Sequence, residues 1–148
     1  MQKIDASNSP EGLVSRVFDA YRAAIFAKDV GAFVALYAED VRIFELWETW
    51  SHSSVESWRA MAVEWFDGLG EDHVVVEMAG AKIHAEPGLV IAHAFLTYRG
   101  VSAIGLERRA MTNRLTWVLQ PVDGEWKIVH EHTSAPVSHE TLKVILKR

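Results

Sequence analysis

The feature of this sequence that most constrains its fold is a change in the spacing of apolar residues at about His73. Before it, apolar side chains recur every three or four residues, as on the buried face of a helix. After it, the spacing changes to two, as on strands that bury one face. Helices followed by a series of strands predict an α+β domain, in which an antiparallel sheet packs one face on the helices. The 148 residues suit one domain, so we expect a single domain over 1–148.

Three helices are expected in the first half, each opened by residues that can cap a helix. The capping groups are Ser9, Asp29 and the Ser53–Glu56 capping box. The first helix should run to Lys28, and the second, short helix should end near Ala38–Asp40. The third should carry an apolar stripe from Trp58 to Leu69. A strand-like run, VRIFELW at 41–47, separates the second helix from the third.

The second half is expected to form an antiparallel meander. The β-rich runs are 73–78, 81–86, 89–99, 110–120 and 125–134. Pro87–Gly88 and Asp123–Gly124 supply the turn residues of hairpins between neighbouring runs. The tail, HETLKVILKR at 139–148, is expected to form either a last strand or a frayed helix.

Charge and composition exclude several classes of function. The net charge is −5, and no basic run exceeds Arg108–Arg109, so a nucleic-acid partner is not expected. No stretch is apolar enough to span a bilayer, and the first residues carry no apolar segment after Lys3. We therefore expect a cytoplasmic protein with no membrane partner. The absence of cysteine removes disulfides, thiolate catalysis and cysteine-ligated zinc.

Two histidines flank a glutamate in the run His130-Glu131-His132. On a strand the two imidazoles share one face and Glu131 points to the other. Two imidazoles can ligate zinc, but no HExxH or similar spacing supplies further ligands, so no metal site is predicted. We interpret the histidines as hydrogen-bonding residues of a sheet or dimer interface and Glu131 as the better pocket candidate. A one-residue slip would exchange them and favour a metal site.

The segments AKDVGAFVALYAEDVRIFE (27–45) and DGEWKIVHEHTSAP (123–136) resemble the nuclear transport factor 2-like superfamily. Within it, the chain is most similar to SnoaL-like proteins and to the association domain of calcium/calmodulin-dependent protein kinase type II, over about 11–137. The resemblance implies a cystatin-like cone: a curved antiparallel sheet with a mixed edge, wrapped against three N-terminal helices. It also implies a pocket open at one end and a homodimer formed through the outer face of the sheet.

The resemblance also implies which residues point into the cone. They are Glu45, His93, Phe95, Thr97, Leu115, Trp117, Val129, Glu131 and Thr133, with His130 and His132 pointing outward. The expected ligand-binding residues are Trp47, Trp50, Trp58, Arg59, Phe95, Trp117 and Thr133. Such aromatic walls favour a small apolar or aromatic molecule. The arginines that attract carboxylates in the kinase association domain are replaced by Phe95, Trp117 and Thr133, which leaves Arg59 and Arg114 as possible cations.

Ketosteroid isomerase, another member of the superfamily, suggests a catalytic set. In the alignment, Tyr21 falls on its oxyanion-donating tyrosine and Glu45 on its carboxylate base, with Glu131 or His93 as a second acid or base. A partly buried carboxylate has a raised pKa, which suits a base working near neutral pH. The protonated aspartic acid of the isomerase is replaced by Trp117, so steroid isomerisation itself is not implied. No cofactor is expected.

Two functions stay open at this stage. The first is a cofactor-independent isomerase, dehydratase or cyclase that transfers protons on a small molecule. The second is a non-catalytic dimerisation or ligand-sensing module, in which Tyr21 is a core residue, Glu45 an exposed acid at a strand end, and the tryptophans fill the core. An open cavity that holds a carboxylate with a raised pKa would favour the enzyme.

Overall fold

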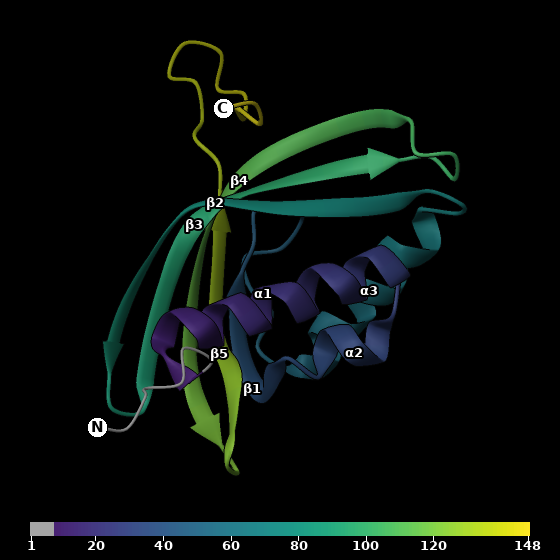
Figure 1. The fold of residues 1–148 in the computed structure, drawn as a ribbon. Coiled ribbons are helices and arrows are strands. Elements are labelled where there is room, and N and C mark those ends of the chain that lie inside the picture. Colours follow the sequence, from purple (N-terminus) through teal and green to yellow (C-terminus); the bar gives the residue numbers. More distant parts are fainter. Residues whose placement is uncertain (1–7) are drawn as a thin grey trace.

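In the computed structural model, which describes residues 8–148, two helices, one strand and a third helix precede the other four strands (Figure 1). The elements are α1 (Pro10–Ala27), α2 (Val30–Val34), β1 (Tyr37–Phe44), α3 (Val55–Gly68), β2 (His73–Glu86), β3 (Leu89–Val101), β4 (Glu107–Val122) and β5 (Glu125–Ser134). The first seven residues of the expected domain, including Lys3 and the segment that follows it, lie outside the described residues.

The helices begin where side chains cap them. The hydroxyl of Ser9 accepts from the Gly12 N–H at 3.0 Å, and the carboxylate of Asp29 accepts from the Ala32 N–H at 3.0 Å. The third helix is capped by Ser54, one residue after the predicted start of the capping box, with Ser54 Oγ accepting from the Ser57 N–H at 3.2 Å. Caps thus fix the start of each helix.

The first strand and second helix differ from the prediction. α2 ends at Val34, because the chain enters β1 at Tyr37, before the predicted strand at 41–47. β1 ends at Phe44, so Glu45 lies in the loop that follows it and not on the strand.

The sheet has the order β1-β5-β4-β3-β2, in which β1 is parallel to β5 and all other pairs are antiparallel. This is the mixed-edge sheet that the resemblance implies. The predicted runs at 73–78 and 81–86 form the single strand β2, whose register shifts between Ala79 and Lys82. Gly80 has φ +66° at this bulge, and an added Cβ would lie 3.3 Å from the ring of Phe95. The long strands bend over the helices (Figure 1).

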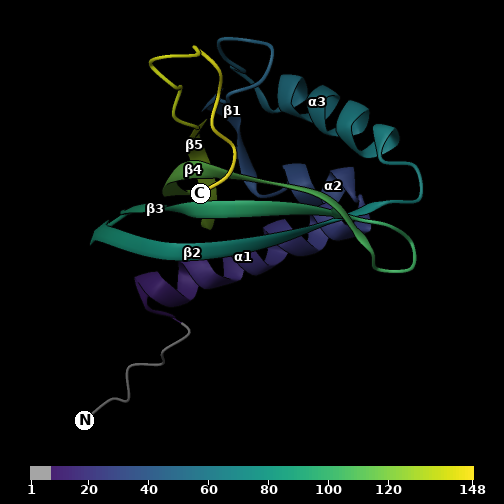
Figure 2. The ribbon, with the colours of Figure 1, turned by 90° about the horizontal axis from the view of Figure 1, so that it is seen from above.

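The inner face of the sheet holds the core. α1 packs along β2 (Figure 2), and the largest fully buried side chains include Ile25, Phe33, Ile43, Leu96, Leu115, Trp117, Leu119 and Ile128. On β3 the buried side chains are Val90, Ala92, Ala94 and Leu96. The alternate residues His93 and Phe95 therefore face outward.

The C-terminal tail forms neither of the two predicted elements. It contains an isolated bridge between Val137 and Val144 and then returns to β4, where the Thr112 N–H donates to the Leu146 carbonyl at 2.7 Å (Figure 2). The tail thus covers part of the β4 edge beyond the end of β5. No helix in the described part of the chain is long and apolar enough to cross a membrane.

Candidate functional site

A cavity of about 850 Å³ lies between the inner face of the sheet, α1, α3 and the loop after β1. Its walls include the aromatic rings of Phe33, Trp47, Trp58, Trp65 and Tyr98. Pockets that hold small organic molecules usually measure about 300–1,000 Å³ and are mostly apolar with a few polar groups. This cavity therefore has the size and lining of a small-molecule site.

The carboxylate of Glu131 lies in this cavity on β5. Its Oε1 accepts hydrogen bonds from the Tyr37 hydroxyl at 2.7 Å and from the Trp117 indole N–H at 2.8 Å. The residue is only 2% exposed. Burial raises the pKa of Glu131 to about 7, although the two hydrogen bonds act to lower it, and the charge of Glu45 adds to the rise. Glu131 can therefore gain or lose a proton near neutral pH.

A β-bulge turns Glu131 into the cavity. Ile128 pairs with Leu119, but His130 pairs with the next residue of β4, Val118, so Val129 is the extra residue on β5. Regular alternation from the buried Ile128 would have placed His130 and His132 inside. With the bulge, Glu131 and Thr133 are buried instead. The predicted inward position of Val129 is wrong for the same reason.

A second carboxylate, Glu45, lines the cavity and contacts a histidine. Its Oε1 lies 3.1 Å from His52 Nε2, and both side chains are almost buried, at 11% and 9% exposed. Burial raises the pKa of Glu45, and the hydrogen bond and charge of His52 counteract this rise. His52 was not predicted, because it lies in a loop where no periodicity marks a residue as inward.

Two tyrosines face the cavity from opposite sides. The hydroxyls of Tyr21 on α1 and Tyr98 on β3 lie 2.7 Å apart, and burial raises the pKa of both. Both phenols therefore keep their protons at neutral pH and can donate hydrogen bonds. The Tyr21 ring also meets the Trp117 ring edge-on at 5.4 Å.

Two polar atoms on the cavity wall, Trp58 Nε1 and Asn113 Oδ1, make no well-aligned hydrogen bond within residues 8–148. The Trp58 N–H faces the Tyr37 hydroxyl and acts to lower the pKa of that phenol, but the contact does not have the geometry of a full hydrogen bond. Trp58 is 3% exposed and Asn113 6% exposed, and both line the cavity. Unpaired buried polar groups are costly, so a bound molecule with matching groups would gain affinity here.

The structure brings together most of the sequence-predicted site. Tyr21, Glu45, Glu131, Trp47, Trp58 and Thr133 line the cavity. Trp117 is fully buried and supports Glu131 through its indole N–H. Trp50 is 96% exposed, and Arg59 pairs with Glu56 at 3.6 Å outside the cavity, so the predicted positions of these two residues are wrong.

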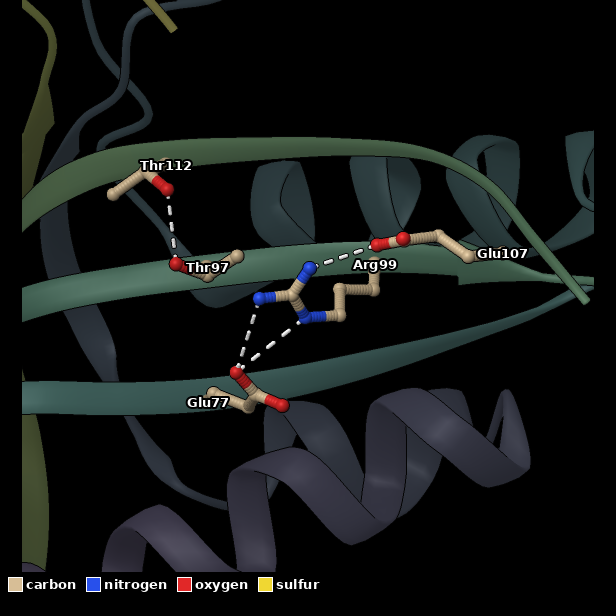
Figure 3. Close-up of polar contacts among 5 residues, drawn as sticks. All are labelled: Glu77, Thr97, Arg99, Glu107 and Thr112. Carbon is tan, nitrogen blue, oxygen red and sulfur yellow. Dashed lines mark hydrogen bonds and ion pairs between the residues drawn. The ribbon is translucent and has the colours of Figure 1, made fainter. Parts of the chain in front are cut away.

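The predicted inward orientation of β3 is also wrong. His93 contacts His84 on the outer face, with their Nε2 atoms 3.3 Å apart, and the Phe95 ring lies under the Arg148 guanidinium at 3.9 Å. Thr97 shares a hydrogen bond of 2.9 Å with Thr112 (Figure 3). The even-numbered residues of β3 point inward, so the odd-numbered residues that were predicted to line the cone point outward.

The outer face carries its own polar network (Figure 3). Arg99 donates to Glu107 at 2.8 Å and to Glu77 at 3.4 Å. Arg114 donates to Ser134 at 3.0 Å, also outside the cavity. A second hollow of about 540 Å³, lined by Phe95, Arg99 and the end of the tail, lies on this side.

The two histidines beside Glu131 point outward, as the resemblance implies. His130 Nδ1 bonds to the Arg42 carbonyl at 2.7 Å, and the Phe44 ring lies edge-on to His130 and His132, at 5.2 and 5.4 Å. Within residues 8–148, no group of three or more His, Cys, Asp and Glu residues is arranged to hold a metal ion.

Comparisons with known proteins agree with this architecture. The model of the SnoaL-like domain family matches residues 14–138. None of the curated proteins compared with the chain matches it. Among solved structures, an NTF2-like protein of unknown function from Pseudomonas putida is 24% identical, with a TM-score of 0.80 over 93% of this chain and 94% of that one.

Two further solved structures share the fold. A protein named as a calcium/calmodulin-dependent protein kinase II association domain, from Xanthomonas campestris, is 18% identical, with a TM-score of 0.72 over 91% of this chain and 94% of that one. A protein named as an aromatic ring hydroxylase, from Novosphingobium aromaticivorans, is 17% identical, with a TM-score of 0.63 over 82% of this chain and 85% of that one.

Proposed function

The chain belongs to the SnoaL-like domain family, and from this premise we propose that it binds a small aromatic molecule and transfers a proton on it without a cofactor. The reaction would be an isomerisation, a dehydration or an aldol-type cyclisation. The observation that carries this proposal is Glu131, a buried carboxylate with a pKa of about 7 in a cavity large enough for a substrate. A base with this pKa is matched to work at neutral pH.

Glu131 is better suited than Glu45 to be the first base. Both hydrogen bonds to its carboxylate end on Oε1, which leaves Oε2 for a substrate C–H. Glu45 is instead hydrogen-bonded to His52 and would act with it as a second acid or base. Two acid–base groups in one cavity can remove a proton at one carbon and return it at another.

The tyrosine pair would stabilise the charge that forms when a proton leaves. Removal of a proton beside a carbonyl places negative charge on the carbonyl oxygen. Tyr21 and Tyr98 share one hydrogen bond, so at least one phenol proton is free for that oxygen. His93 has no part in this scheme, because it lies on the outer face.

The expected ligand is flat and mainly apolar. Trp47, Trp58 and Trp65 supply rings for stacking, and the Trp58 N–H and the unpaired Asn113 Oδ1 supply one donor and one acceptor. The name of the Novosphingobium protein, an aromatic ring hydroxylase, is consistent with an aromatic ligand on this fold.

We propose that the chain forms a homodimer through the outer face of the sheet. Phe95 and the hollow beside it give this face a partly apolar surface. Sedimentation equilibrium should give twice the chain mass of 16.6 kDa, and a single-chain mass would contradict the dimer.

Two further parts of the proposal concern location and an alternative role. We propose a cytoplasmic location, which rests on the sequence alone. A non-catalytic dimerisation or ligand-sensing module is the alternative function.

The test uses 2-tetralone, an aromatic ketone with exchangeable protons beside its carbonyl. Incubated with the chain in D₂O, it should take up deuterium, which proton NMR measures. Glu131→Gln should reduce the catalysed rate by at least about 100-fold, because general-base catalysis commonly contributes about 10²–10⁴-fold. The matched control is Glu125→Gln, an exposed residue on the same strand.

The control should keep the exchange rate of the unsubstituted chain, and both variants should retain its far-ultraviolet circular dichroism. Equal exchange rates in the Glu131→Gln variant and the unsubstituted chain would contradict the role of Glu131. Binding of 2-tetralone with no exchange by the unsubstituted chain would favour the ligand-sensing module.

A further inference from the structure

The histidine that contacts Glu45 has a second partner on its other side. His52 Nδ1 lies 2.7 Å from the hydroxyl of Ser57, while His52 Nε2 lies 3.1 Å from Glu45 Oε1. All three residues line the large cavity. A hydroxyl, an imidazole and a carboxylate joined in this order form the arrangement that activates a serine nucleophile.

We propose that Ser57, His52 and Glu45 form a catalytic triad that accepts an acyl group from a small aromatic or apolar ester on Ser57 and releases it to water. This activity differs from the proposed proton transfer, because its reacting atom is the Ser57 oxygen and Glu131 has no part in it.

The backbone fixes the imidazole in place. His52 and Ile43 of β1 exchange two backbone hydrogen bonds, of 2.8 and 2.9 Å, in an isolated antiparallel bridge. The ring also meets the Trp58 ring edge-on at 5.2 Å. The residue is only 8% exposed, so its ring has little freedom to leave Ser57 or Glu45. A fixed base oriented by a third group is the geometry that nucleophilic catalysis needs.

Ser57 occupies a position that favours attack. It lies in the first turn of α3, where its N–H is already capped by Ser54 and its hydroxyl lines the cavity. The positive end of the helix dipole favours the negative charge that develops on the serine oxygen as its proton leaves. The residue is exposed, so an ester that enters the cavity can reach it.

The proton and bond changes balance without a cofactor. When the Nε2–H of His52 donates to the Glu45 carboxylate, Nδ1 is free to accept the Ser57 proton. The serine oxygen then bonds to the acyl carbon, the ester C–O bond breaks, and the alcohol leaves with the proton held by His52. Water attacks the acyl-serine by the same route, which releases the acid and restores Ser57.

The next residue along α3 supplies a donor for the ester. The indole N–H of Trp58 is buried on the cavity wall and makes no well-aligned hydrogen bond within the described chain, although it faces the Tyr37 hydroxyl. An ester carbonyl oxygen would give this N–H a better acceptor, and the hydrogen bond would strengthen as negative charge grows on that oxygen. The aromatic walls favour an apolar or aromatic acyl group.

The test is covalent labelling of the full chain with diisopropyl fluorophosphate, followed by mass spectrometry of the intact chain and its peptides. One phosphoryl group should attach, and it should map to Ser57. Mapping on the unsubstituted chain needs no variant, so misfolding cannot produce the expected result. No adduct, or an adduct only at another residue, would overturn the proposal.

Variants then test each member of the triad. Ser57→Ala should abolish labelling, whereas Ser53→Ala, the matched control at an exposed neighbour, should label like the unsubstituted chain. His52→Gln should slow labelling by at least about 100-fold, because a general base commonly contributes about 10²–10⁴-fold. An unchanged rate in His52→Gln would overturn the role of the imidazole.

Glu45 acts here through His52 and is a positioning residue. Glu45→Gln should slow labelling because it removes the carboxylate that accepts from the His52 Nε2–H, and Glu45→Asp, which keeps a carboxylate, should restore part of the lost rate. A purely structural role would be filled by the glutamine of similar shape, so an unchanged rate in Glu45→Gln would overturn the role of the carboxylate. Labelling of Ser57 and Glu131-catalysed deuterium exchange into 2-tetralone are measured independently, so either proposal can fail while the other holds.

Discussion

On the inner face of the sheet the carboxylate of Glu131 receives its hydrogen bonds from neutral groups, whereas on the outer face Glu77 and Glu107 pair with a cation, Arg99. Glu131 is 2% exposed, and the side chains of the two outer glutamates are 57% and 50% exposed. The same residue type is therefore placed in two different environments on one sheet.

The difference explains which carboxylates suit chemistry. The hydroxyl of Tyr37 and the indole of Trp117 satisfy the carboxylate of Glu131 but do not neutralise its charge, so burial still raises its pKa. An arginine partner in water keeps a carboxylate ionised and gains little stability, because solvent screens the pair. Burial of Glu131 on the inner face therefore lowers the stability of the fold at high pH, and the same burial brings the pKa of this carboxyl close to neutral.

The largest expected effect is a decrease in the free energy of unfolding as pH rises, caused by ionisation of Glu131. The folded state raises the pKa from the ordinary 4.5 to about 7, so it holds this proton more tightly than the unfolded state. The resulting stabilisation is fully present below about pH 4.5 and is lost as pH rises through about 7, with a total on the order of 3 kcal/mol. Urea denaturation from pH 4.5 to 8 measures it.

Glu131→Gln should remove this part of the pH dependence, and Glu77→Gln on the outer face should leave it unchanged. The free energy of unfolding of Glu131→Gln should therefore increase relative to that of the unsubstituted chain as pH rises. If the free energies of these two proteins change in parallel with pH, the pKa of Glu131 is the same in the folded and unfolded states, and the prediction is wrong.

A smaller effect is expected from one hydrogen bond to Glu131. Tyr37→Phe removes the hydroxyl that donates to Oε1 at 2.7 Å and favours the ionised carboxylate. The pKa of Glu131 should then rise above about 7, by on the order of one pH unit. Carbon-13 NMR of the glutamate side-chain carboxyls measures this titration directly.

The matched control is Tyr98→Phe, which removes a cavity hydroxyl bonded to Tyr21 and leaves both hydrogen bonds to Glu131 in place. Its titration midpoint should stay close to that of the unsubstituted chain. A midpoint in Tyr37→Phe that falls, or that matches the control, would rule out the Tyr37 hydroxyl as a stabiliser of the ionised form.

The sequence predicts the parts of the fold that local chemistry fixes. Ser9 and Asp29 cap their helices, because their side chains can accept hydrogen bonds from the N–H groups of the first turn. Asp123–Gly124 forms a turn with positive φ at both residues, a conformation that aspartate tolerates and glycine adopts readily. The confirmed α+β class follows from the same local signals. Glu131 was placed inside by resemblance to a family, and the bulge at Val129 that turns it inward has no mark in the sequence.

Residues were misplaced where local chemistry is ambiguous. β3 reads LVIAHAFLTY and is apolar on both faces, so alternation cannot show which face is inner, and Phe95 was assigned to the wrong one. Trp50 and His52 lie in one loop, where no period exists, yet one is exposed and the other buried. His52 is held by its backbone pairing with Ile43 and by its ring contacts with Glu45 and Ser57, which follow from the tertiary structure.

The smallest effect is expected on the outer face. Arg99→Ala removes contacts to Glu77 and Glu107, but all three side chains meet solvent, so Tm should fall by less than about 3 °C. Because salt screens exposed charges, most of this change should vanish in 1 M NaCl, as measured by differential scanning calorimetry of a dilute sample. The dilute sample keeps the chain as a single copy, in which Arg99 meets solvent; a loss several times larger that persists in salt under these conditions would contradict this exposed setting. The proposed dimer would cover this face, so a larger loss seen only at concentrations where the chain is dimeric would place Arg99 in that interface.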